Sequence, residues 1–285
     1  MKETDYGLEL LPDLQKSQAL LLRKIIDFFK VNDINYFLTG GSVLGSIYYQ
    51  DFLPYDDDVD LGIPRKDYAR LIEILRKESQ IFGKDTFSNH YSLDSDFKYP
   101  AIKVFNLNYN VTSLLENDNE ISHPFIDIAP IDGSPTGFFK KRAFKIKFTL
   151  LAKLYAYSMV MINPNKKSKA IYQIQHLIAN ILALFVKQDK QFFLKKLDNY
   201  IAKFDIDSSE RSGTLLGRYG MKELVPSKDW GKGKNAQFSN IEVRIPEHPE
   251  DYITDLYGSY RTYTKEEFLE EWHIIILGKN PDLKF

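Results

Sequence analysis

Two neighbouring stretches decide the fold, Phe37-Leu-Thr-Gly-Gly-Ser-Val-Leu-Gly45 and Pro54-Tyr-Asp-Asp-Asp-Val-Asp-Leu-Gly62. In the first, an apolar strand runs into two glycines and a serine. Glycines let the backbone approach a phosphate closely, and a helix opening at Ser42 would present its N–H groups and positive dipole end to an anion. Such a tripeptide alone also suits a plain turn. Together with the acidic stretch, it predicts that Gly40, Gly41 and Ser42 bind the diphosphate of a phosphoryl donor.

The second stretch carries the carboxylates. Asp58 and Asp60 are two residues apart, so strand geometry places both on one face, and Asp56 shares that face if the strand extends back to it. Converging carboxylates repel one another unless a divalent cation lies between them, and oxygen-only ligation suits Mg²⁺ or Mn²⁺. Val59 and Leu61 are core-type residues, which argues against a merely solvated acidic loop. A metal site is expected here.

A third carboxylate lies in Phe125-Ile-Asp-Ile-Ala-Pro-Ile-Asp132. Asp127 stands in an otherwise apolar strand, where a charge without a partner is costly. A metal shared with the first pair removes that cost, and a role as general base is the alternative. Asp132 is expected to be a turn residue before Gly133.

Three further side chains are candidate substrate contacts, each weighed against an ordinary structural role. Arg65 and Lys103 could each reach a phosphate, or simply be solvated. Tyr257 could stack on a base or cap a choline by a cation–π contact, although core packing is the commoner use of an aromatic residue.

Length and periodicity predict an α+β protein with a mixed sheet. The chain has 285 residues and no cysteine, and its start lacks the apolar core of a signal peptide, so a cytoplasmic location is expected. Paired strands are expected at 101–107 and 109–115, joined near Asn108. The expected organisation is a catalytic core over 1–135, a basic helical insertion over 136–205, and a segment over 206–285 that returns to the core.

Charge is distributed unevenly along the chain. Residues 133–188 contain ten basic residues and no acidic one, although the whole chain has a net charge of −1. Such a block predicts an anionic partner or a membrane surface. Within it, 170–186 has no formal charge but is short and polar for a membrane span, so it is either a helix buried in the protein or part of an amphipathic helix pair on an anionic leaflet. Nucleic acid is not expected, because the segment has long apolar runs.

The motifs taken together resemble the LicD family of bacterial phosphocholine transferases, related to fukutin and fukutin-related protein. The resemblance rests on Gly40-Gly41-Ser42, on Asp56-Asp57-Asp58-Val59-Asp60-Leu61-Gly62, on Asp127-Ile-Ala-Pro-Ile-Asp-Gly133 and on the late Tyr252-Ile-Thr-Asp-Leu-Tyr-Gly-Ser-Tyr260. It spans roughly residues 15–265. Tyr55 stands where family members commonly have Trp, and Arg261-Thr-Tyr-Thr replaces a stretch that often carries Met and Pro.

The resemblance implies a nucleotidyltransferase-like core in which Asp58, Asp60 and Asp127 bind Mg²⁺, with Asp56 as an accessory ligand. It implies a CDP-linked donor, usually CDP-choline, and a sugar hydroxyl of a surface glycan or its lipid-linked precursor as acceptor, with release of CMP. Two alternatives stay open: a nucleotidyltransferase that attacks the α-phosphorus and releases pyrophosphate, and a non-enzymatic scaffold in glycan assembly. Peripheral contact with the inner face of the membrane would suit a lipid-linked acceptor.

Overall fold

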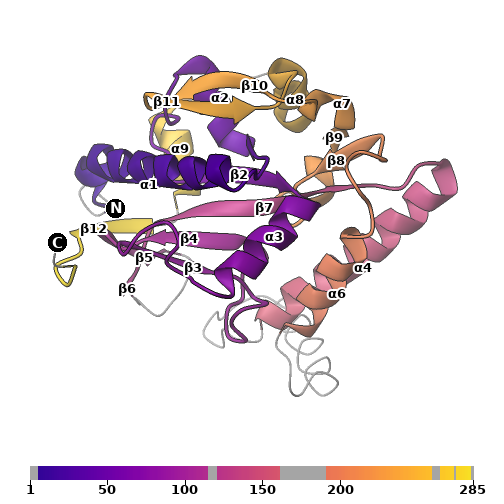
Figure 1. Ribbon diagram of the computed structural model, residues 1–285, viewed down its shortest axis with the longest axis horizontal. Coiled ribbons are helices and arrows are strands. Elements are labelled where there is room, and N and C mark those ends of the chain that lie inside the picture. The colour runs from indigo at the N-terminus through magenta and orange to yellow at the C-terminus, as the bar shows by residue number, and fades with distance from the viewer. Residues whose placement is uncertain (1–5, 115–120, 161–190, 259–263, 273, 284–285) are drawn as a thin grey trace.

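The computed structural model describes residues 6–114, 121–160, 191–258, 264–272 and 274–283 (Figure 1). The fold is α+β, as predicted. In chain order, the elements that build the central sheet and its helices are η2 (Leu8–Leu10), α1 (Leu11–Val31), β1 (Phe37–Leu38), α2 (Gly40–Tyr48), β2 (Val59–Pro64), α3 (Arg65–Leu75), β3 (Thr86–Asn89), β4 (Ile102–Asn106) and β7 (Phe125–Gly133). The others are β5 (Tyr109–Ser113), β6 (Ile121–Ser122), α4 (Phe138–Val160), α6 (Phe192–Ile201), β8 (Arg211–Gly213), η3 (Gly220–Glu223), β9 (Val225–Pro226), α7 (Ser227–Trp230), β10 (Lys234–Phe238), β11 (Ile241–Ile245), α8 (Pro249–Tyr257), α9 (Lys265–Glu271) and β12 (Ile274–Lys279).

The central sheet has the strand order β1-β2-β7-β4-β3, and β8 and β9 extend it from the end of β7. β2 and β7 are parallel, and the other pairs in this sheet are antiparallel. Val59, Leu61 and Ile63 alternate along β2 and are fully buried or nearly so, which leaves Asp60 on the opposite face. The alternation therefore fixes which face of the sheet carries the acidic residues.

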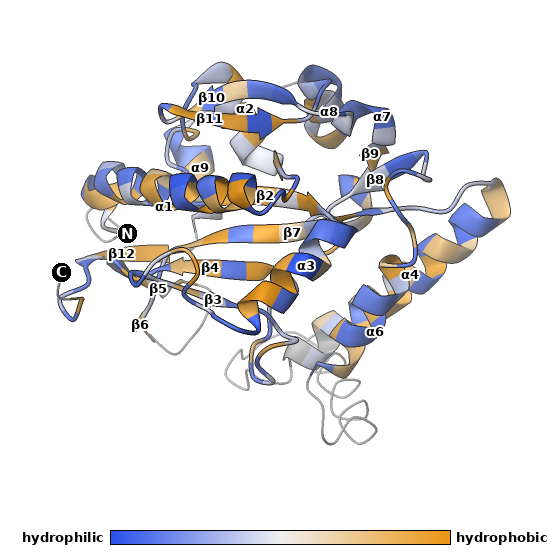
Figure 2. Cartoon of the chain, in the orientation of Figure 1, coloured by the Kyte–Doolittle hydropathy of each residue, from blue (hydrophilic) through white to orange (hydrophobic). Residues whose placement is uncertain are grey.

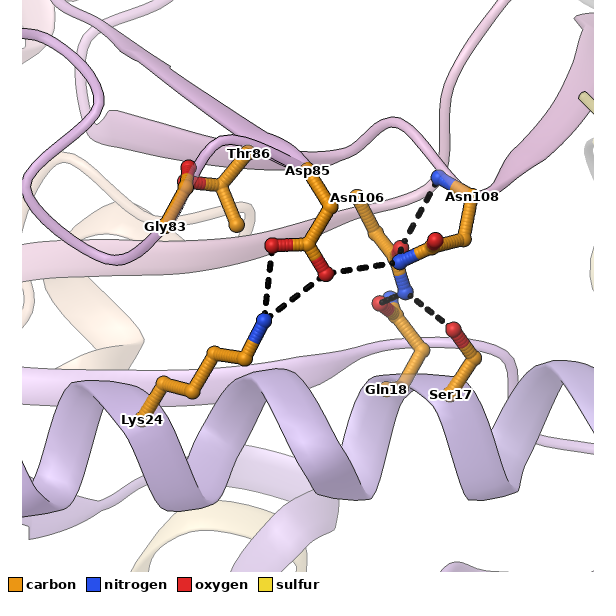
Figure 3. Close-up of polar contacts among 8 residues, drawn as sticks. All are labelled: Ser17, Gln18, Lys24, Gly83, Asp85, Thr86, Asn106 and Asn108. Atoms are coloured by element: carbon orange, nitrogen blue, oxygen red, sulfur yellow. Dashed lines mark hydrogen bonds and ion pairs between the residues drawn. The ribbon is translucent and has the colours of Figure 1, made fainter. Parts of the chain in front are cut away.

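Helices α1 and α3 pack on this sheet (Figure 1). α1 begins with Pro12 in its first turn and buries Leu22, Ile25 and Phe29 at helical spacing. A polar network also fastens α1 to the turns around β3 and β4 (Figure 3). The network contains the Lys24–Asp85 ion pair at 2.7 Å and the Asn106 side-chain amide, which donates to Ser17 Oγ at 2.9 Å and to Gln18 Oε1 at 3.1 Å.

The predicted pairing of 101–107 with 109–115 is wrong. β4 pairs with β3 and β7, whereas β5 belongs to a second sheet of order β12-β5-β6. The second sheet has its own small core, in which Tyr109 and Val111 of β5 meet Leu14 of α1 and Ile276 of β12. Burial against α1 and β12 separates the two strands, although only Leu107 and Asn108 connect them.

Helices α4 and α6 pack side by side at one end of the sheet (Figure 1). Phe144 and Phe148 of α4 and Leu197 and Ile201 of α6 form their shared core, which also receives Leu215, Leu216 and Leu224. No helix in the described ranges is long and apolar enough to cross a membrane. α4 and α6 lie within the predicted basic helical insertion over 136–205, whereas the uncharged run 170–186 lies outside the described residues.

A third unit covers the glycine loop. The β10–β11 hairpin lies with α2, α7 and α8 above the central sheet (Figure 1), where Trp230 contacts the rings of Phe37 and Tyr252. The domain boundaries at 135 and 205 stay a prediction, and β8 and β9 show how the later segment rejoins β7.

Candidate active site

The glycine loop connects β1 to α2. Gly40 has a φ of +57°, a left-handed conformation that favours glycine, and α2 begins there rather than at Ser42 as predicted. The Gly40 N–H donates to the Tyr252 hydroxyl at 3.0 Å. A Cβ atom placed on Gly40 would lie 3.4 Å from Asp60 Oδ2 and 3.4 Å from the Tyr257 hydroxyl, and one on Gly41 would lie 3.5 Å from Asp56 Oδ2. The two glycines therefore lie directly against the carboxylates.

Strand register brings three charged residues into one row. Asp60 of β2 is paired with Asp127 of the parallel strand β7, and Asp127 is paired with Lys103 of β4. Paired residues on neighbouring strands project to the same face, so the three side chains are neighbours. Ser42 holds the backbone of Asp60 in place, because the Ser42 Oγ accepts a hydrogen bond from the Asp60 N–H at 3.0 Å.

Lys103 is the cation of this row. Its Nζ lies 2.8 Å and 3.1 Å from the two carboxylate oxygens of Asp127. The residue is only 5% exposed, and its ammonium group also lies over the Phe125 ring, 3.2 Å from the ring centre. Its predicted substrate role stays a prediction, and the contact that the structure gives it is with Asp127.

The carboxylates repel one another. Burial, followed by the charges of Asp58, Asp57 and Asp60, raises the pKa of Asp56 well above its ordinary range. Burial and then the charges of Asp58, Asp127 and Glu223 likewise raise the pKa of Asp60, and Lys103 opposes this effect. The structure thus draws together Asp56, Asp58, Asp60 and Asp127, and a positive charge is what the cluster needs.

Asp57 also belongs to this cluster. β2 begins at Val59, so the strand alternation that was expected to place Asp58 on the face of Asp60 applies neither to Asp58 nor to Asp57. Asp57 is 8% exposed, and burial, then the charge of Asp58, raises its pKa. Two glutamines of α1 hold this loop by its backbone: Gln15 Nε2 donates to the Asp56 carbonyl at 2.8 Å, and Gln18 Nε2 to the Asp57 carbonyl at 3.4 Å.

The cluster offers a divalent cation suitable ligands. Within the described part of the chain, no three His, Cys, Asp or Glu side chains stand in an arrangement that would already hold a metal ion. The donor set nevertheless fits Mg²⁺ or Mn²⁺, because its side-chain donors are carboxylate oxygens only, and mutual repulsion disfavours their charged form without a cation. The ligand assignment Asp56, Asp58, Asp60 and Asp127 stays a prediction.

Aromatic and acidic residues from the later chain close the site. The Tyr257 hydroxyl lies by Gly40, and the Tyr257 ring contacts the Tyr219 ring, with centres 6.3 Å apart. The carboxylate of Glu223 accepts hydrogen bonds from Thr214 Oγ1 at 3.2 Å and from the Tyr219 N–H at 3.3 Å. The charge of Glu223 raises the pKa of Asp60, but no sequence motif around Glu223 predicted that it belongs to the site.

Arg65 has a different place from the one predicted. Its Nε donates to Asp132 Oδ1 at 2.7 Å, its Nη2 pairs with the other oxygen of Asp132, and its Nη1 lies 2.9 Å from Asp198 Oδ1. All three nitrogens of the guanidinium are therefore occupied by protein carboxylates. The expectation that Asp132 is a turn residue is wrong, since it is fully buried in β7 as the partner of Arg65.

A hollow of about 400 Å³ adjoins this site. It lies between α4 and the loop 215–221, with Phe148, Leu197 and Leu216 in its lining and Lys153 and Arg218 as cations. Tyr219 belongs to its lining, and the Tyr219 ring also contacts the ring of Tyr257, whose hydroxyl lies by Gly40.

Comparisons with known proteins agree with this geometry. Residues 33–150 match the model of the LicD/FKTN/FKRP nucleotidyltransferase domain, a range that contains the glycine loop and all the clustered aspartates. The chain is 24% identical over 278 residues to the lipopolysaccharide cholinephosphotransferase LicD of Haemophilus influenzae, covering 91% of this chain and 96% of that protein. It also matches uncharacterized proteins of Rickettsia prowazekii (25% identity, 38% of this chain and 41% of that protein) and Rickettsia typhi (31%, 21% and 20%).

Proposed function

Residues 33–150 are a nucleotidyltransferase domain of the LicD family, and from this premise we propose that the chain transfers phosphocholine from a CDP-linked donor to a glycan hydroxyl, releasing CMP. It is an enzyme of the phosphotransferase class, homologous to a cholinephosphotransferase that acts on lipopolysaccharide. The acceptor we propose is accordingly a lipopolysaccharide glycan or its lipid-linked precursor.

The observation that carries the proposal is the parallel register of β2 and β7 beneath the glycine loop. It places Asp60 beside Asp127, while Gly40 and Gly41 leave open backbone above them. The donor diphosphate would lie between the N-terminus of α2 and the carboxylates, where the helix dipole favours an anion. Asp58, Asp60 and Asp127, with Asp56, would hold Mg²⁺ or Mn²⁺, which supplies charge neutralisation and Lewis acidity to the diphosphate.

The chain's own residues position the reactants. In the transfer, the acceptor oxygen forms a bond to the distal phosphorus as the bond from that phosphorus to the CMP oxygen breaks, and the hydroxyl proton passes to a base. Asp127 is our candidate for this base if it is not a metal ligand, and Lys103 holds its carboxylate in place. Tyr257 walls the site beside Gly40, and the hollow between α4 and 215–221 gives the acceptor its approach.

The test is an end-point assay with the full chain, Mg²⁺, purified lipopolysaccharide and a panel of CDP-linked donors. We expect CDP-choline to yield CMP and phosphocholine-modified acceptor. Asp60→Asn should be inert, whereas Asp13→Asn, at an exposed carboxylate on α1, should be fully active. Release of pyrophosphate from a nucleoside triphosphate instead of CMP would establish the nucleotidyltransferase alternative, and no turnover with any donor would favour the scaffold role.

A further inference from the structure

Helix α4 has two apolar faces rather than one. One face is packed against α6 and the loop 215–221 through Phe144 and Phe148. The other face contains Ile146, which follows Phe144 by two residues and therefore lies about 200° around the helix, and this face points outward. Its large apolar residues repeat at helical spacing and are exposed, namely Phe139 (83%), Ile146 (62%) and Leu150 (55%), and Phe138 (72%) adjoins them. Figure 2 shows hydrophobic and hydrophilic residues mixed along the whole length of α4.

The charges on α4 are all positive. The helix has six basic residues and no acidic one: Lys140, Lys141, Arg142, Lys145, Lys147 and Lys153. Lys145 and Lys147 flank Ile146, about 100° to either side of it. Lys141 pairs with Glu210 at 2.7 Å, and Lys147 lies over the Tyr200 ring, 4.4 Å from its centre. Within the described part of the chain, the other four have no ion-pair partner.

We propose that this outward face of α4 binds the surface of an anionic phospholipid bilayer. An apolar line flanked only by cations is the pattern of a helix lying in the membrane interface, where apolar side chains enter the acyl boundary and the stems of Lys and Arg reach back to the headgroups. A second copy of α4 would oppose like charges, and a nucleic acid would offer no apolar phase to Phe139 and Ile146. Charge and hydropathy together therefore select a lipid surface.

This proposal goes beyond the transfer reaction and holds whether or not the donor is CDP-linked. It has one consequence for the site, because Thr149, Ala152 and Lys153 of the same helix line the hollow next to Tyr219. Docking through α4 would bring that hollow to the leaflet, where a membrane-borne glycan acceptor is held.

The experiment is co-sedimentation of the full chain with vesicles of phosphatidylcholine alone or with 40% phosphatidylglycerol, at roughly 0.05 M and 0.5 M salt. We expect binding only to the anionic vesicles at low salt. One cation near the surface is worth up to about 1 kcal/mol, or about fivefold in affinity, within a Debye length. The triple variant Lys140→Ala, Arg142→Ala, Lys145→Ala should bind at least about tenfold more weakly, and so should Phe139→Gln with Ile146→Gln.

Matched variants keep the test specific. Lys30→Ala, Lys77→Ala, Lys232→Ala removes the same charge elsewhere, and Leu20→Gln with Val31→Gln removes exposed apolar surface from α1; both should bind vesicles like the unaltered chain. Absence of binding to anionic vesicles at low salt would overturn the proposal. Binding that the α4 variants do not weaken would also overturn it, as would α4 variants that only convert a dimer to a monomer. Because the assay needs neither donor nor acceptor, its outcome is independent of the proposed reaction.

Discussion

Replacing Lys103 by Met should destabilise the protein more than any comparable change at an exposed lysine. The side chains of Lys103 and Asp127 are 6% and 29% exposed, and their charged atoms are 2.8 Å apart. Removing one member of a buried pair typically costs about 3–5 kcal/mol, because the other charge is left without a partner. Asp127 keeps some contact with water, so we expect the lower end, about 3 kcal/mol, and a fall in Tm of roughly 6–10 °C.

A double-mutant cycle separates the pair from the site around it. Adding Asp127→Asn to Lys103→Met should recover most of the loss, to within about 1 kcal/mol, because a neutral pair leaves no orphaned charge. The control is Lys24→Met: Lys24 pairs with Asp85 at 2.7 Å, but the side chains are 41% and 24% exposed, so about 0–1 kcal/mol is expected.

The assay is urea unfolding at pH 7 with a chelator, followed by tryptophan fluorescence. Equal losses of stability for Lys103→Met and Lys24→Met would refute this explanation, because the two ion pairs are expected to differ in cost only through their burial. The same measurement with Mg²⁺ tests the donor set: a cation that binds the cluster replaces the lost positive charge and should return part of the stability of Lys103→Met.

Three further outcomes follow from the geometry. Asp60→Asn should abolish turnover, yet leave the free energy of unfolding without metal unchanged or higher. Because the pKa of Asp60 is raised in the folded protein, its carboxyl stabilises the fold below the unfolded pKa of about 3.9, and this contribution is lost as the pH rises through the folded pKa. Urea unfolding should therefore show a smaller fall in stability from pH 5 to pH 8 for the variant than for the unaltered chain. Gly40→Ala should cost about 1–2 kcal/mol because of its φ of +57°, whereas Gly41→Ala should fold normally and weaken donor binding in calorimetry; equal stability of the two would contradict this. Asp198→Ala should destabilise the protein by about 3 kcal/mol in thermal unfolding, because the substitution removes one partner of the buried Arg65. Glu210→Gln, which breaks an exposed ion pair, should cost less than about 1 kcal/mol. Similar losses for the two variants would show that burial does not matter there.

The acidic centre could be predicted largely from local pattern. Alternation of apolar residues around Asp60 and Asp127 determines which face of each strand carries the carboxylate, and double glycine marks a close backbone approach. These signals lie within a few residues of the groups concerned. They do not require knowledge of which strands are neighbours, although the observed β2–β7 register is what brings the two aspartates together.

Apart from the start of α2, the errors concern partners that are distant in the sequence. Arg65 is followed by a helix and looked free to reach a phosphate, but Asp198, more than a hundred residues later, occupies it. β4 and β5 are adjacent in the chain, yet β5 finds its partner in β12. Glu223 lies in a 3₁₀ turn without any motif and reaches the site only because β8 and β9 attach to the end of β7. Burial decides such pairings, and burial is a property of the assembled chain.

The pairing of β5 with β12 has a consequence for synthesis on the ribosome. When residue 135 has been made, every clustered aspartate exists, but β12 (Ile274–Lys279) does not. Until it does, one edge of β5 lacks its strand partner and the small core around Leu14 of α1 lacks Ile276; α1 is also the helix that holds Asp56 and Asp57 through its glutamines. A nascent chain would therefore expose an unpaired apolar strand edge for most of its elongation, the condition under which chaperones bind and aggregation begins. Truncation just before Ile274 should consequently yield an aggregating chain even though all clustered aspartates are present.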